Sequence, residues 1–328
     1  MAQLTLTQMG YTATSSKECL DFVLDFDTMR ASFVDLKPDA RHTLVTSVKT
    51  SKASKRSWRL WKIGDEGVPW SPKMVHLGRA HRTPILKSNL QKAVRMRNNQ
   101  EAVRTALEWL AIDRTALFRR LPIICVEDAS LVEGTATIVW LMMAGERGPM
   151  MAKIAEFIWR YVDAMCDCET VYQSREIESK PSHLDMVGKG KGMDAASLKV
   201  RESFGGMKCD TTRLRNASVY YHRNPDRIYR LQDREYVLPD ELDFDHIVLP
   251  EAIDYHPCPW ILKKLAEKTE LTQSEIKGII WIGDSSANVR KPWTVDRQNA
   301  MRKDEDYVKV SYHLRMIRSG IEKSRYRC

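Results

Sequence analysis

Apolar residues recur at helical spacing through residues 88–168, and this pattern constrains the fold more than any other feature of the chain. Within 102–110 they fall at i, i+1, i+4, i+5 and i+8, which places them on one face of a helix. The stretch 135–144 is apolar on all sides, so we expect a helix buried against several neighbours. A further helix is predicted over 150–166. Together these segments predict a central multi-helix core over residues 73–168.

The residues on either side of this core predict smaller units. Two alternating, β-branched segments indicate a basic β-hairpin within an N-terminal region, residues 1–72. Residues 169–193 are polar and rich in Gly, Ser and Lys, which indicates a flexible linker. Residues 194–328 are expected to form a C-terminal, mainly helical domain. The predicted fold class is therefore mainly α, with a central multi-helix core, a small N-terminal β-hairpin and a smaller C-terminal helical region.

Local signals predict where individual elements begin and end. The apolar residues of 17–29 favour one short helix before the hairpin. Asn98 and Asn99 are expected to end a first central helix, and Asp113 to cap a later one. Pro122 is expected to kink or end that later helix, because proline lacks an N–H donor and its ring clashes with the preceding turn.

Cysteine usage and the length of the apolar stretches favour an intracellular location. The seven cysteines are odd in number and scattered, so reduced thiols are expected rather than a disulfide framework. The first residues show no basic region followed by an apolar stretch, which a signal peptide has. The longest apolar stretch, 137–144, is shorter than the roughly 20 residues that span a bilayer. We therefore expect a cytoplasmic or nuclear protein that is not associated with a membrane.

Positive charge is concentrated in residues 41–104, which contain fifteen Lys and Arg against three Asp and Glu, whereas the whole chain has 52 against 43. Such clustering is typical of a face that binds a polyanion, because cations displace the counterions condensed on phosphates. Tryptophans lie among these cations and could stack unpaired bases. The alternative is a strand with one core face and one solvated basic face. The candidate nucleic-acid-binding residues are Lys49, Lys52, Lys55, Arg56, Trp58, Arg59, Trp61, Lys62, Lys92, Arg95 and Arg97.

A second group of chemically capable residues is crowded into residues 243–258. It consists of Asp243, Asp245, His246, Glu251, Asp254, His256 and Cys258. Carboxylates and imidazoles bind divalent metals, but the spacing matches no familiar metalloenzyme signature, and the prolines between them favour an ordered loop. If a divalent metal binds here, the expected ligands are Asp245, His246, Asp254 and His256. No other cofactor is predicted.

Three shorter patterns have weaker functional interpretations. The Gly-Lys-Gly-Lys-Gly run at 188–192 lacks the spacing of a phosphate-binding loop and favours a linker. Glu127 and Asp128 are more typical of helix caps than of a catalytic pair. Residues 265–276 have the rhythm of a helix-turn-helix, and 273–276 open its second helix. A groove-reading role is the less favoured interpretation of that motif, because the residues at 278–281 are expected to be buried.

The central helices carry three short motifs in series. These are Lys87-Ser-Asn-Leu-Gln-Lys-Ala-Val-Arg95, Gln100-Glu-Ala-Val-Arg-Thr-Ala-Leu-Glu-Trp-Leu110 and Leu117-Phe-Arg-Arg-Leu-Pro-Ile-Ile-Cys-Val-Glu-Asp128. In this order they resemble the helical C-terminal collar of clamp-loader-related AAA+ proteins. The resemblance covers about 45 of 328 residues, over 87–128, and the ATPase module of that family is absent. It implies an oligomerising or DNA-associated helical module without its motor.

These observations favour a non-enzymatic protein that binds DNA or RNA through the basic segment 41–104. It would act as an accessory or assembly factor in replication, repair or genome packaging, and it could form homo-oligomers or a protein complex. Two alternatives remain open. One is a metal-dependent hydrolase or nuclease that uses the group at 243–258, and the other is an interaction protein for an acidic partner.

Overall fold

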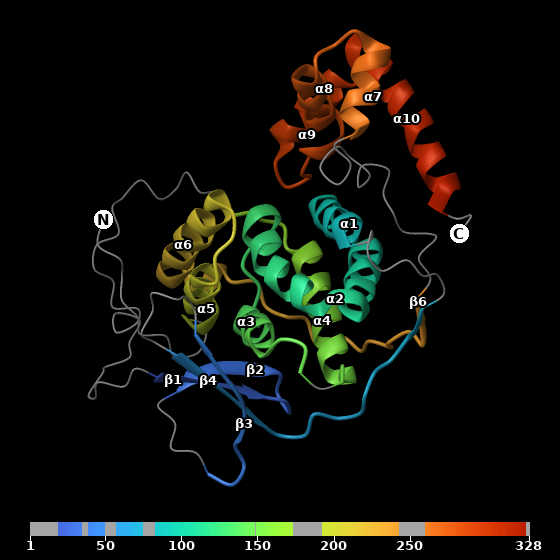
Figure 1. Cartoon of the computed structure of the whole chain (residues 1–328). Coiled ribbons are helices and arrows are strands. Elements are labelled where there is room, and N and C mark those ends of the chain that lie inside the picture. The colour runs from blue at the N-terminus through green and yellow to red at the C-terminus, as the bar shows by residue number, and fades with distance from the viewer. Residues whose placement is uncertain are drawn as a thin grey trace.

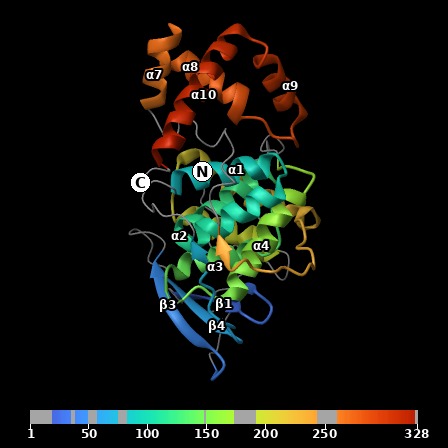
Figure 2. The same cartoon turned by 90° about the vertical axis from the view of Figure 1, so that its right-hand side faces the viewer.

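The computed structural model describes residues 19–34, 39–49, 57–74, 83–147, 149–172, 192–242 and 260–325. Three parts follow one another through the molecule: a small sheet, a central helical layer and a C-terminal helical unit (Figures 1 and 2). The chain is mainly α with β structure near the N-terminus, as the sequence predicts.

The N-terminal sheet has four strands in the order β2-β1-β4-β3. The strands are β1 (Cys19–Asp25), β2 (Arg30–Val34), β3 (Thr43–Lys49) and β4 (Ser57–Ile63). The predicted hairpin is present, because β3 and β4 pair antiparallel. Strand β1 lies between β2 and β4, antiparallel to the first and parallel to the second.

The prediction of a helix over 17–29 is wrong, because its described residues from Cys19 to Asp25 form β1. Phe22 and Leu24 are fully buried on the face that packs against the helices, and Val23 on the opposite face is also only 5% exposed. A strand buried on both faces is a short continuous apolar run, which cannot be told from a buried helix by its periodicity.

The central layer is built from α1 (Thr83–Arg95), α2 (Asn99–Asp128), α3 (Thr135–Ala144) and α4 (Ala152–Asp167). Asn98 caps α2, with its side chain accepting a hydrogen bond from the amide of Glu101. All ten residues of α3 are buried, as predicted, and α3 packs against both α5 and the sheet. The indole of Trp140 donates to the carbonyl of Phe22 at 3.0 Å and so ties α3 to β1.

Helix α2 is interrupted at Asp113 rather than at Pro122. Asp113 has non-helical backbone angles, and its carboxylate accepts a hydrogen bond from the amide of Ala116 at 2.9 Å. This confirms the predicted cap. Pro122 lies inside the helix, which continues to Asp128. Leu121 next to the proline is fully buried, and tertiary packing of this kind outweighs the one backbone hydrogen bond that proline removes.

Two further helices complete the central core. They are α5 (Gly192–Ser203) and α6 (Lys208–Arg223), which pack against each other and against α2 and α3. One buried core therefore includes residues from Phe22 to Leu242, and a second core begins only at Ile261. The C-terminal domain that the sequence predicts from residue 194 thus begins later, because α5 and α6 bury their apolar residues in the central core. Of the predicted linker 169–193, residues 173–191 lie outside the described ranges.

A strap at residues 229–242 connects the core towards the C-terminal unit. It runs past α4, where the guanidinium of Arg160 donates to the carbonyl of Gln232 at 3.1 Å and the rings of Trp159 and Tyr236 are 5.4 Å apart. It ends at β6 (Glu241–Leu242), which pairs in parallel with β5 (Lys73–Met74).

The C-terminal unit contains α7 (Trp260–Thr269), α8 (Gln273–Ile280), a π-helical turn (Trp281–Ser285), α9 (Pro292–Met301) and α10 (Glu305–Arg325). It lies on the side of the helical layer opposite to the sheet, next to α1 (Figures 1 and 2). Over the ranges that the structure describes, every helix is too short or too polar to cross a bilayer.

Candidate nucleic-acid interface

The two tryptophans of the predicted basic face lie within the packing of the sheet. Trp58 is 1% exposed, and its ring centroid is 5.3 Å from that of Phe33 and 6.1 Å from that of Phe22. Trp61 is 9% exposed and donates from its indole to Asp21 at 2.8 Å. Contrary to the prediction, neither ring offers an open face for base stacking.

Two of the three hairpin cations that the structure describes are paired. Arg59 donates from Nε and Nη2 to the two oxygens of Asp21, at 2.7 Å each, and Lys62 forms an ion pair with Glu66. The hydrogen bonds that Arg59 donates to Asp21 raise the pKa of its guanidinium, although burial opposes the charged form. Lys49 is exposed on the edge strand β3. Lys52, Lys55 and Arg56 lie outside the described residues.

The cations of the next segment hold helices together. Lys92 and Arg95 are buried at 6% and 7% exposure. Arg97 donates to the carbonyl oxygens of Cys166 and Asp167 at the C-terminal end of α4, at 3.1 and 2.9 Å. Negative carbonyl ends of helices attract cations, which explains this position. The described cations of 41–104 are thus spread over the sheet, β5, α1 and the start of α2, and Arg59, Lys62, Lys92 and Arg95 among them are paired or buried.

The predicted metal ligands Asp245, His246, Asp254 and His256 fall outside the described residues. Within the ranges that are described, no three side chains of His, Cys, Asp or Glu are grouped so as to hold a metal ion. The metal-dependent alternative stays a prediction.

Helices α7 and α8 form the helix-turn-helix that the sequence indicates. Three residues separate the helices, and Glu270, the first of them, has φ of 62°, the left-handed conformation that ends a helix in a tight turn. The hydroxyl of Thr272 accepts a hydrogen bond from the amide of Glu275 at 3.3 Å, and the carboxylate of Glu275 accepts one from the amide of Thr272 at 2.8 Å. This capping box fixes where α8 begins and lowers the pKa of Glu275.

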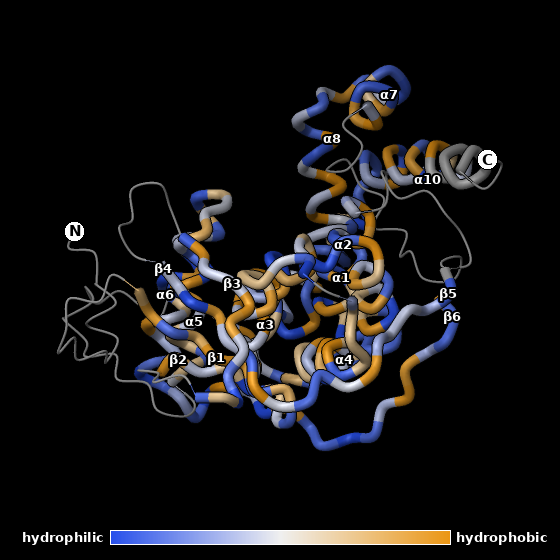
Figure 3. Tube along the Cα trace, turned by 60° about the horizontal axis from the view of Figure 1, so that its bottom comes forward, coloured by the Kyte–Doolittle hydropathy of each residue, from blue (hydrophilic) through white to orange (hydrophobic). Residues whose placement is uncertain are grey.

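Helix α10 closes this motif into a three-helix unit with its own core. The carbonyl of Thr269 at the end of α7 accepts a hydrogen bond from the ammonium group of Lys309 on α10, at 2.9 Å. Hydrophobic and hydrophilic residues alternate along α8 and α10 (Figure 3). This pattern is expected of helices that bury one face and expose the other. The buried residues of this core are Ile261, Leu265, Ile276, Ile280, Val310 and Leu314, each at most 1% exposed.

The first turn of α8 faces solvent. Gln273, Ser274 and Lys277 are exposed, whereas Ile276 between them is fully buried. Exposed aromatic and cationic side chains lie elsewhere on the unit: Trp293 is 56% exposed, and the ammonium of Lys264 lies 4.9 Å from the ring centroid of Trp260. The unit from residue 260 to 325 contains fourteen Lys and Arg against nine Asp and Glu. It is therefore a positively charged unit with a polar helix end in solvent.

Arg290 makes the largest set of described side-chain hydrogen bonds between this unit and the central core. Arg290 donates from all five of its N–H groups to backbone carbonyl oxygens. The acceptors belong to the ends of three helices of the core and are Val94, Asp128, Met165, Cys166 and Cys168, at 2.7 to 3.2 Å. Asn288 adds a hydrogen bond to the carbonyl of Asp128 at 3.1 Å. The unit is thus anchored at the carbonyl ends of the core helices.

Polar residues of α1 and α2 also converge beside this joint. Arg95 on α1 donates to Asp128 at the end of α2 at 2.7 Å, and Gln91 one turn earlier donates to the other oxygen of the same carboxylate at 2.7 Å. Arg120 donates to the amide oxygen of Gln91 at 2.7 Å and lies 3.7 Å from Glu127. Glu127 and Asp128 therefore act in a buried ion-pair network, which the sequence pattern did not indicate.

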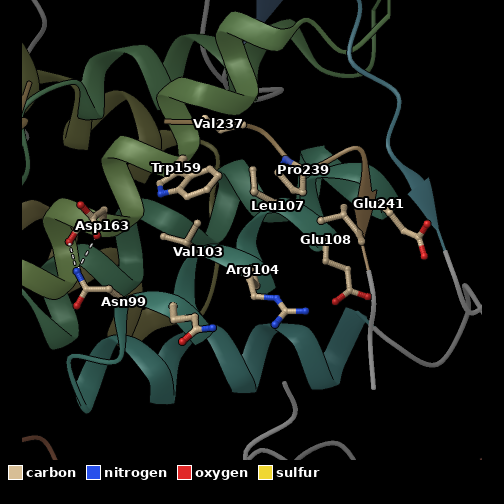
Figure 4. A pocket seen from close by; sticks show the side chains of 12 residues that line it. Asn99, Val103, Arg104, Leu107, Glu108, Trp159, Asp163, Val237, Pro239 and Glu241 are labelled. Carbon is tan, nitrogen blue, oxygen red and sulfur yellow. Dashed lines mark hydrogen bonds between the residues drawn. The ribbon is translucent and has the colours of Figure 1, made fainter. Parts of the chain in front are cut away.

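A cavity of about 530 Å³ lies between α2, α4 and the strap (Figure 4). Leu107 and Trp159 contribute to its apolar wall. At one end, Asp163 accepts hydrogen bonds from Asn99 at 2.7 Å and from Arg234 of the strap at 2.8 Å. The polar side chains at this end of the cavity thus fasten the strap to the helices.

Comparisons of the chain with protein-family models, with curated proteins and with solved structures found no match. The functional argument therefore starts from the geometry of the described residues.

Proposed function

We propose that this protein binds duplex DNA without catalysing a reaction, and that α7 and α8 form its reading element. The observation that carries the proposal is the three-residue turn and capping box between these helices, together with the exposed first turn of α8. In DNA-binding helix-turn-helix units the second helix enters the major groove with its N-terminal residues on the base edges, while the first helix crosses the backbone.

The residues at the start of α8 fit that role chemically. Gln273 carries an amide that can make two hydrogen bonds to adenine, and Ser274 carries a hydroxyl that can donate or accept. Lys277, one turn later on the same exposed side, provides a positive charge for a base or phosphate. Burial of residues 278–281, which the sequence predicts, would argue against insertion of α8 into a DNA groove. In the structure Trp281 is 40% exposed. Only Ile276 and Ile280 of α8 are buried.

The net positive charge of residues 260–325 supports affinity for the DNA backbone, in addition to the base contacts of α8. Its excess of cations over carboxylates is five, and phosphate contacts supply most of the non-specific binding free energy. We place the DNA interface on residues 260–325 and not on the segment 41–104, because the predicted cations Arg59, Lys62 and Arg95 form ion pairs within the fold. Lys49 remains available for a separate backbone contact.

A second candidate function is the binding of an acidic protein segment along α10. Val308, Tyr312 and Met316 are 55 to 63% exposed and follow one another at a spacing of four, which makes an apolar stripe on a helix. Arg315 beside them is exposed and cationic. An amphipathic acidic helix would satisfy both features.

Fluorescence anisotropy with labelled duplexes separates these functions. Wild-type protein at about 50 mM salt should bind duplex DNA, and log affinity should fall steeply with log salt concentration. The double variant Gln273→Ala with Ser274→Ala should lose roughly 1–3 kcal/mol on a preferred sequence, because each removes a base contact. Gln100→Ala, an exposed glutamine on α2, is the matched control and should bind as wild type.

Two results would overturn the DNA-binding proposal. One is undetectable binding of duplex DNA at this salt concentration. The other is equal affinity of the double variant and the Gln100→Ala control on every sequence tested from a randomised pool. Loss of partner binding in Tyr312→Glu, with unchanged DNA affinity, would favour the second candidate.

A further inference from the structure

A cluster of charged side chains fills the space between α1, the end of α2, α6 and the joint to the C-terminal unit. We call it the junction cluster. It contains five cations, Lys87, Arg95, Arg120, Arg213 and Lys291, and three carboxylates, Glu127, Asp128 and Asp210. It is therefore two positive charges in excess.

The three carboxylates are already engaged by cations. Asp128 accepts from Arg95 at 2.7 Å, and Asp210 lies 3.4 Å from Arg120. Glu127 accepts from Arg213 at 2.8 Å and is 3.7 Å from Arg120. Each carboxylate thus serves at least one guanidinium, and the same carboxylates also act on the two lysines, Asp210 and Glu127 on Lys87 and Asp128 and Glu127 on Lys291.

Two donors of the cluster have no acceptor. The Nε atom of Arg120 is buried without a hydrogen-bond partner among the described residues, although both of its terminal nitrogens are used. Lys87 makes no ion pair or hydrogen bond with any residue that the structure describes, and it is exposed at the rim of the cluster. Buried donors in folded proteins are nearly always paired with an acceptor, so the buried Nε atom of Arg120 is a donor that an oxygen of a bound group could satisfy.

The electrostatics of the two lysines agree with this surplus of charge. Partial burial lowers the pKa of Lys87, and the neighbouring guanidinium of Arg120 lowers it further, while Asp210 and Glu127 oppose both effects. Burial also lowers the pKa of Lys291; Arg213 and Arg95 add to that effect, while Asp128 and Glu127 oppose it. A bound anion would remove the repulsion that both lysines experience.

Arg213 of the cluster also borders a hollow in the surface of α6. A shallow hollow of about 570 Å³ is lined by Arg213 of the cluster and by Lys208, Thr212 and Asn216. Lys208 is exposed at the start of α6, so a further cation lies beside the hollow. The hollow is large enough for a phosphate group and its ester.

We propose that the junction cluster binds a phosphate group. A phosphate dianion matches the excess of two positive charges, and its oxygens can accept from the planar guanidinium of Arg120 and from Lys87 together. The group comes either from the backbone of bound DNA or from a free phosphate ester, and the chemistry of the site is the same for both. The site itself does not depend on the helix-turn-helix assignment.

Titration calorimetry with inorganic pyrophosphate tests the site without DNA. Wild-type protein should bind one pyrophosphate, and Lys87→Ala should weaken that binding about ten-fold or more, since a charge-assisted contact is lost. Lys87→Arg should retain most of the affinity. The matched control is Lys199→Ala on α5, another partly buried lysine with a lowered pKa, whose charged neighbours are Glu202 and Arg215. This control should bind as wild type.

Anisotropy with DNA then distinguishes the two sources of phosphate. If the site holds a backbone phosphate, pyrophosphate should compete with DNA, and Lys87→Ala should reduce the slope of log affinity against log salt concentration by about one. If the site holds a free ester, Lys87→Ala should leave DNA affinity unchanged. No binding of pyrophosphate to wild type, or equal binding to Lys87→Ala and wild type, would overturn the proposal. Failure of the Gln273 and Ser274 variant to affect DNA binding leaves this titration unaffected.

Discussion

The Arg290 guanidinium offers the sharpest test of how the C-terminal unit is held. Its five N–H groups donate to five backbone carbonyls, and these belong to the C-terminal ends of α1, α2 and α4 or to the residue just after α4. The last carbonyls of a helix have no partner within the helix and carry partial negative charge. Arg290→Met keeps much of the aliphatic volume and removes all five donors.

The expected loss follows from the number of hydrogen bonds. Each contributes about 1 kcal/mol net, so five contribute about 5 kcal/mol, and the cost of burying the guanidinium offsets part of this. We expect Arg290→Met to lower the free energy of unfolding of the C-terminal unit by about 3–5 kcal/mol. Arg290→Lys should recover only part of this free energy of unfolding, because an ammonium group has three N–H donors for the five carbonyl acceptors.

Urea unfolding followed by tryptophan fluorescence measures the total effect, and native-state hydrogen exchange locates it. Amides of α7 and α8 should lose protection in Arg290→Met, while amides of α3 should keep it. Arg297→Met is the matched control, since Arg297 is exposed on α9 of the same unit. If Arg290→Met and Arg297→Met unfold within about 1 kcal/mol of each other, the carbonyl contacts do not hold the unit and the reasoning is refuted.

Three further changes have expected outcomes. Burial raises the pKa of Asp194 to about 7, despite hydrogen bonds from the amides of Ala136 and Gly134. Because the folded state holds this proton more tightly than the unfolded state, the free energy of unfolding should fall as pH rises from about 4 to 7, by about 4 kcal/mol, and then level off. Urea titrations should show a flatter profile for Asp194→Asn; parallel profiles would contradict the assignment. Gly134→Ala should cost about 1–3 kcal/mol in thermal unfolding, since Gly134 has φ of 89° and a Cβ would lie 2.8 Å from the ring of Phe157. The control Gly145→Ala, at φ of 71° with no atom within 4 Å, should cost less, and equal costs would exclude the ring clash. Thr272→Ala should cost about 1 kcal/mol in urea unfolding of the C-terminal unit through loss of the capping box, and an unchanged midpoint would show that the box is not stabilising.

Local sequence patterns predict best those elements that have the same environment on every side. Helix α3 is buried on every side, so its composition alone identifies it. The cap at Asp113 and the break at Asn98 depend on side chains that bond their own neighbouring backbone, and such signals are readable in sequence. The sequence pattern of β1 predicts a helix instead of a strand, because the strand is buried on both faces. Only its pairing with β2 and β4 distinguishes it from a buried helix.

The candidate interface was predictable in part. The helix-turn-helix is encoded within twelve consecutive residues, so its turn and cap could be expected from the sequence. Positive charge in 41–104 could be counted, but its partners could not be foreseen. Arg59 meets Asp21 across paired strands, and Arg95 meets Asp128 thirty-three positions later. A cation that forms such an ion pair contributes to the fold, and the sequence alone does not reveal a partner so far along the chain.

One side chain of α1 connects the junction cluster to the end of α8. Arg95 donates to Asp128 at 2.7 Å and to the carbonyl of Ser285 at 2.5 Å, and its guanidinium lies 5.8 Å from the ring centroid of Trp281. Trp281 and Ser285 begin and end the π-helical turn that directly follows α8. The same guanidinium therefore contacts both the central core and the turn that follows α8. Arg95 thus fastens the C-terminal unit to the core in addition to the carbonyl contacts of Arg290.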